Sequence, residues 1–146
     1  DEIQTQRRNS LRYHLRTQGW GRASSEKIAA MYTPESLSEI HDFYLLLRAG
    51  FALYDMQQYE EALAIFEKLA QSSESVELAM ARLWQAHLLD LLGKRQEAMT
   101  VYQFVVDMNI DSAIQHSQYD LSYSPSPYAQ KRMTDPFTRI ENQDED

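Results

Sequence analysis

Two stretches of the chain decide its fold. Residues 43–69 read FYLLLRAGFALYDMQQYEEALAIFEKL, and residues 79–105, which lie 36 positions further on, read AMARLWQAHLLDLLGKRQEAMTVYQFV. The second half of each stretch has apolar residues at i, i+3, i+4 and i+7, the spacing of one helix face. The chain therefore repeats an amphipathic helix. The positions are Ala62, Ile65, Phe66 and Leu69 in the first copy and Ala98, Val101, Tyr102 and Val105 in the second.

Turn residues divide the region around these stretches into four expected helices. Thr33 followed by Pro34 is typical of an N-cap and a first helical position, so a long first helix is predicted to begin there. Gly93 is predicted to end the third helix, because glycine readily adopts the left-handed conformation that follows a helix. We expect two antiparallel helical hairpins. The four helices are predicted to span about 34–54, 59–71, 76–92 and 95–108.

A small residue, an alanine and an aromatic residue keep the same spacing in both hairpins. They are Gly50, Ala62 and Phe66 in the first and Ala86, Ala98 and Tyr102 in the second. In this pattern residues 43–110 resemble the tetratricopeptide repeat family. Small residues let paired helices cross closely, and the aromatic ring fills the space beside the crossing. The resemblance implies an all-α solenoid of two stacked antiparallel hairpins, with short helical flanks as caps.

The chain also departs from the family pattern. The early tryptophan position holds Leu46 in one repeat and Arg82 in the other, and the closing proline is absent. The period is 36 rather than the family's 34 or so. Because the spacings inside each hairpin are intact, we place the two extra residues in the loop between the repeats, around 71–77.

Composition bounds the class of protein. The 146 residues suffice for one domain, and 43% hydrophobic with 25% charged residues is ordinary for a globular chain. The net charge of −8 argues against a nucleic-acid surface, which needs clustered cations. No apolar run approaches the roughly 20 residues that span a bilayer, so the chain as given is expected to be soluble. Its first residue is Asp1, which suggests a processed product or a piece of a longer protein; its compartment stays open.

No pattern in the sequence points to catalysis, a metal or a cofactor. There is no cysteine, no glycine-rich phosphate loop and no nucleophile elbow. The adjacent acids Glu60 and Glu61 are better explained as first-turn compensation of a helix dipole than as an acid–base pair. The histidines lack metal-ligand spacing and are interpreted as surface or packed residues. They are His14, His41, His87 and His116.

Four segments are expected along the chain. Residues 1–32 form a basic arm with a short helix, and 33–110 form the two hairpins. Residues 111–140 form a loop and a capping helix from about 127 to 133, after which Phe137 and Ile140 tuck back onto the repeats. The acidic tail 141–146 is predicted to be disordered. Ser126 is expected to be the N-cap of the capping helix; phosphorylation of the Ser-Pro run is the alternative.

The basic arm has two possible uses. Its arginines could contact an acidic partner or a membrane surface, or they could simply solvate a capping helix. The sequence leaves both open. The arginines are Arg7, Arg8, Arg12 and Arg16.

Partner binding is the function that the resemblance implies. Such domains usually bind a protein or peptide in the concave face lined by the first helix of each repeat, and perform no chemistry. The alternative is an accessory or regulatory soluble domain of a larger enzyme or membrane protein whose active part precedes residue 1. The flanks could also cover the concave face. Carried to this chain, the partner-binding residues are Arg48, Phe51 and Asp55 with Trp84, His87 and Asp90.

Overall fold

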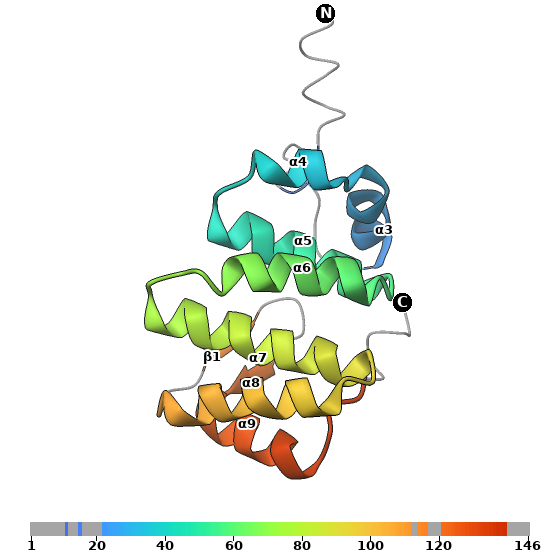
Figure 1. Ribbon diagram of the computed structural model, residues 1–146. Coiled ribbons are helices and arrows are strands. Elements are labelled where there is room, and N and C mark those ends of the chain that lie inside the picture. The colour runs from blue at the N-terminus through green and yellow to red at the C-terminus, as the bar shows by residue number, and fades with distance from the viewer. Residues whose placement is uncertain (1–10, 12–14, 16–21, 112–113, 117–120, 140–146) are drawn as a thin grey trace, which may run out of the picture. The chain divides into compact units, whose positions relative to one another are not determined.

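The described residues form helices and a short β-hairpin that precedes the last of these helices (Figure 1). A computed structural model describes residues 11, 15, 22–111, 114–116 and 121–139. The all-α class is thereby confirmed for the described residues. Strand β1 (Ile114–His116) pairs antiparallel with β2 (Leu121–Tyr123). The helices are α3 (Arg22–Met31), α4 (Pro34–Ser38), α5 (Phe43–Asp55), α6 (Tyr59–Leu69), α7 (Ser75–Leu91), α8 (Arg95–Asp107) and α9 (Pro125–Thr134).

The chain divides into two compact units, with the boundary inside α6 between Ile65 and Phe66. In the first unit α3 packs on α5, and Leu11, Leu15 and Ile28 are buried. In the second unit α8 packs on both α7 and α9 (Figure 1). Four arginines of the basic arm and the tail 141–146 lie outside the described residues, as does Ile140.

The predicted long first helix is wrong, because two helices occupy its span. Thr33 and Ser36 form a capping box that begins α4, and α4 ends at Ser38. The Asp42 side chain then accepts a hydrogen bond from the Leu45 N–H at 3.0 Å and begins α5. Side-chain capping satisfies an N–H that would otherwise have no partner, so Asp42 stabilises a new start over a continuous helix. Ile40 lies in the link between α4 and α5, and its side chain is buried, which anchors the break between the two helices.

The turns after α5 and α7 have the same geometry. Gln57 and Gly93, 36 residues apart, both adopt left-handed backbone angles, with φ of 60° and 77°. The N–H of the residue after each of them donates to a carbonyl five residues back: Gln58 to Leu53 at 2.9 Å and Lys94 to Leu89 at 2.8 Å. These bonds close the helix ends in the Schellman manner. The expected role of Gly93 is confirmed, and Gln57 takes the same role without being glycine.

We expect opposite effects from exchanging residue types at these two turns. Gly93→Ala should lower the free energy of unfolding by about 1 kcal/mol, because a left-handed angle is unfavourable for a side chain. A Cβ at this position meets nothing within 4 Å, so no steric clash contributes. Gln57→Gly should raise the free energy of unfolding by up to about 0.5 kcal/mol. Urea unfolding followed by circular dichroism measures both, and a stabilising Gly93→Ala would contradict the shared turn geometry.

The C-terminal helix begins earlier than predicted. Ser124 is the N-cap of α9, and Ser126 lies inside the helix. The Ser126 hydroxyl donates to the Val105 carbonyl at 2.7 Å and accepts from the Ile110 N–H at 2.8 Å. It therefore ties α9 to the end of α8, a long-range role that local capping rules do not predict. Strands β1 and β2 take part of the loop predicted between residue 111 and the capping helix.

Every position of the family-like pattern is buried. Phe66 and Tyr102 have no exposed surface, and the small residues beside them are equally enclosed. Within the described residues, no helix is both long and apolar enough to cross a membrane. The buried small residues are Gly50, Ala62, Ala86 and Ala98.

Candidate functional site

The three predicted partner-binding residues of α5 are hydrogen-bonded or buried within the first unit. Arg48 donates from Nη1 to the Leu15 carbonyl at 2.9 Å, and Asp55 accepts a 2.7 Å hydrogen bond from the buried Ser25 hydroxyl. Phe51 is fully buried. Burial lowers the pKa of the Arg48 guanidinium. These side chains hold α5 to the segments that precede it.

The three predicted residues of α7 are covered by the C-terminal segment. Trp84 is 4% and His87 is 2% exposed. The Phe137 ring stacks on the His87 ring with centroids 4.0 Å apart, and it meets the Trp84 ring edge-on at 5.6 Å. Phe137 returns onto α7, as expected. Of the two possibilities left open for this face, coverage by the flank is the one seen in this conformation.

Asp90 is the centre of a buried hydrogen-bond network. Its carboxylate accepts from Arg95 Nη1 at 3.0 Å to each oxygen, and its side chain is only 2% exposed. Oδ2 also accepts from the Tyr102 hydroxyl at 2.9 Å and from the backbone N–H of Phe137 at 3.0 Å. Charge-assisted bonds of this kind are stronger than neutral ones. Asp90 therefore links α7, α8 and the segment that follows α9.

Arg95 extends the same network to the end of α9. Its Nη2 donates to the carbonyls of Arg132 and Met133 at 2.7 and 2.8 Å. The last carbonyls of a helix lack internal partners, and a cation there also opposes the negative end of the helix dipole. One guanidinium thus neutralises Asp90 and caps α9.

His87 is neutral in this network. Its Nδ1 lies 2.8 Å from the Tyr102 hydroxyl, which donates its own proton to Asp90. Nδ1 must therefore carry the ring proton and donate to Tyr102. Burial, and secondarily the charge of Arg132, lowers the pKa of His87 well below its ordinary value. Burial, and then the charge of Asp90, raises the pKa of Tyr102.

A His–Tyr–Asp chain resembles a proton relay in its chemistry, but this one is enclosed. Its visible effect is to hold the C-terminal segment on α7. Within the described residues, no group of three or more acidic, histidine or cysteine side chains could hold a metal ion.

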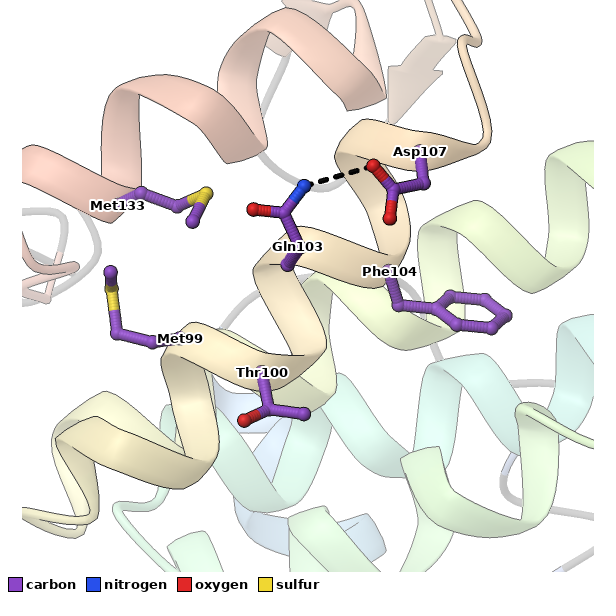
Figure 2. A pocket seen from close by; sticks show the side chains of 6 residues that line it. All are labelled: Met99, Thr100, Gln103, Phe104, Asp107 and Met133. Carbon is purple, nitrogen blue, oxygen red and sulfur yellow. Dashed lines mark hydrogen bonds between the residues drawn. The ribbon is translucent and has the colours of Figure 1, made fainter.

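The second unit also carries an open groove between α8 and α9 (Figure 2). Its volume is about 500 Å³. Figure 2 shows the Met99 and Met133 side chains pointing toward each other, one from each helix. Phe104 is 45% exposed, and the Arg82 guanidinium lies 5.2 Å from the centre of its ring. The lining residues are Met99, Thr100, Gln103, Phe104, Asp107 and Met133.

The groove has one acidic side chain at its edge. Asp107 is exposed and accepts at Oδ1 from the Gln103 amide at 2.9 Å (Figure 2). Its Oδ2 has no hydrogen bond within the part of the chain that the structure describes. Methionine side chains are flexible and polarisable, so a groove that contains them can adapt to different apolar groups. The site therefore combines an adaptable apolar surface with a carboxylate.

Neither the network nor the groove was predicted from the sequence. A signal for the network was present: Tyr102, on the apolar stripe of its helix, is a buried tyrosine that needs a hydrogen-bond partner where phenylalanine would not. A signal for the groove was Phe104, a large aromatic residue outside the apolar stripe of its own helix. Of the predicted residues of α7, His87 and Asp90 belong to the network and Trp84 contacts the Phe137 ring; none of the six predicted partner-binding residues lines the groove.

Comparison with family models, with curated proteins and with solved structures finds no match.

Proposed function

We propose that this chain is a protein-interaction module of the tetratricopeptide type, which binds a short segment of a partner protein in the α8–α9 groove. The observation that carries the proposal is the exposure of Phe104 at one side of the groove, with the opposed side chains of Met99 and Met133 at the other (Figure 2). An exposed phenylalanine on a helix that also presents flexible apolar side chains is typical of a site that another protein covers. The equal turns at Gln57 and Gly93 support the repeat architecture.

The chemistry of the groove indicates the kind of segment that fits. One apolar side chain of the segment would lie between Met99 and Met133, and a second would lie against Phe104 on the other side of Gln103 (Figure 2). A lysine or arginine close to these apolar residues in the partner's sequence would pair with Oδ2 of Asp107. The net charge of −8 favours approach of a basic segment over long distances.

Selection of random peptides on the intact chain tests the proposal. We expect the binders to combine large apolar residues with Lys or Arg. Phe104→Ala should weaken their binding at least about tenfold, which corresponds to roughly 1.4 kcal/mol. The matched control is Tyr44→Ala, which removes another exposed aromatic ring, 64% exposed on α5.

The two variants give a clear decision. Equal binding by the parent chain and a folded Phe104→Ala variant would contradict the groove as the binding site. Equal weakening by Tyr44→Ala would show that exposed rings are bound without regard to the groove.

A further inference from the structure

The segment that follows α9 has one buried residue among those that the structure describes. Phe137 is only 3% exposed, while Asp135, Pro136 and Thr138 around it are exposed. An extended stretch with a single buried side chain is the usual form of a short peptide bound to a folded domain. The segment therefore has the character of a ligand that is attached to its own binding site.

The seat of Phe137, formed by Trp84, His87 and Asp90, recognises two parts of the same residue. The ring lies parallel to His87, with 15° between their planes, and nearly perpendicular to Trp84, at 72°. The backbone N–H of the same residue donates to Asp90 Oδ2 at 3.0 Å. Aromatic rings prefer these arrangements, and the bond to a carboxylate adds direction.

Neither contact requires that the bound residue be joined to α9. Any extended segment with a phenylalanine offers a ring and an N–H in the same relation. Contacts outside the C-terminal segment hold His87 and Trp84 in place. His87 is hydrogen-bonded to Tyr102, and the Phe66 ring stacks on Trp84 with centroids 6.2 Å apart. The far wall of the seat is therefore built by α6, α7 and α8, without the C-terminal segment.

We infer that the seat is a peptide-binding site for a phenylalanine in an extended segment of a partner protein, and that Phe137 fills it in the absence of that partner. This site is distinct from the α8–α9 groove of the proposed function. It gives the predicted residues Trp84, His87 and Asp90 a binding role that depends on displacement of the chain's own segment. Phe137 contacts α7 through its ring and one hydrogen bond, and the Arg132 guanidinium lies 5.6 Å from the centre of the same ring, so an outside segment that makes further contacts can replace it.

The test uses the intact chain and a synthetic peptide with the sequence of residues 134–139, TDPFTR. The Phe137→Ala chain has an empty seat, and the indole N–H signal of Trp84 in nitrogen–proton NMR spectra reports on occupancy. We expect saturable shifts when the peptide is added to roughly millimolar concentration, the range of effective concentrations for tethered segments. The parent chain should bind at least about tenfold more weakly, because its own segment competes. The peptide with alanine in place of phenylalanine should leave the signal unchanged.

A second variant covers the case in which Phe137→Ala does not fold. Phe137→Leu keeps an apolar side chain but loses the parallel contact with His87, so the phenylalanine peptide should still displace it more readily than in the parent. Absence of a peptide-induced shift in whichever variant is folded would overturn the inference. So would equal shifts in the parent and the variant. A parent chain that dimerises in sedimentation, with a monomeric Phe137→Leu chain, would replace the partner by a second copy and also overturn it.

Discussion

Asp90→Ala is expected to lower the free energy of unfolding by about 3 kcal/mol. The substitution leaves Arg95 without its carboxylate, and it leaves the Tyr102 hydroxyl and the Phe137 N–H without an acceptor. Removing one partner of a buried ion pair typically costs about 3–5 kcal/mol. The lower end applies because Arg95 is 33% exposed and water can solvate part of its charge. Urea unfolding followed by circular dichroism measures the loss.

Two further variants separate the charge of Asp90 from its hydrogen bonds. Asp90→Asn keeps an oxygen acceptor but removes the charge. Its free energy of unfolding should therefore lie between those of the parent and Asp90→Ala. Asp107→Asn, a change of the same type at an exposed position of α8, should alter the free energy of unfolding by less than about 0.5 kcal/mol. If Asp90→Asn and Asp107→Asn lower the free energy of unfolding equally, the network around Asp90 does not stabilise the fold as proposed.

His87 is expected to make the protein less stable in acid. Its pKa is lowered in the folded state, so the unfolded chain binds a proton below about pH 6.5 while the folded chain does not. Stability from this source is fully present above that pH. It falls by up to about 1.4 kcal/mol per pH unit as the pH decreases, until the folded-state pKa is reached. Between pH 7.5 and pH 5.0 the loss amounts to about 2 kcal/mol if the folded histidine stays neutral throughout.

Comparison of histidine variants isolates this contribution from that of the carboxylates. His87→Gln removes the titrating group and keeps a side chain that can donate to Tyr102, so its unfolding free energy should decrease less between pH 7.5 and pH 5.0 than that of the parent. The matched control is His41→Gln, at an exposed position. The unfolding free energy of His41→Gln should decrease as much as that of the parent between these two pH values. Parallel curves for the parent and His87→Gln would show that His87 does not titrate on unfolding.

Local signals predicted the parts of the fold that depend on neighbours in sequence. Glycine at 93 ends α7, proline at 34 begins α4, and the apolar stripe of α8 identifies its buried face. The break before α5 was missed because two signals compete there. The apolar periodicity favours one helix, and the Asp42 side chain favours a new start; the buried Ile40 fixes the outcome only in the folded unit.

The site was harder to predict because its contacts join residues far apart in the chain. The Phe137 N–H meets Asp90, and the Arg95 guanidinium reaches the carbonyls at the end of α9. The sequence identified the α7 face and the return of Phe137, and it left open whether a flank covers that face; it did not indicate that Phe137 is the residue that covers Trp84 and His87. The groove requires α8 and α9 to be placed side by side, and the hydrogen bonds of Ser126 and of Arg95 join these two helices. No periodic pattern contains that information.

The bond between Phe137 and Asp90 spans 47 residues, and this separation has a consequence during synthesis of the chain. Phe137 follows the last residue of α8, Asp107, by 30 residues, which at about 5–20 residues per second is roughly 1.5–6 seconds. Helical hairpins form far faster than this, in microseconds to milliseconds. The α7–α8 hairpin can therefore be complete while its His87 face is still uncovered. For those seconds Trp84 and His87 are open to any other segment in the cell, including chaperones that bind aromatic side chains, before the chain's own phenylalanine exists.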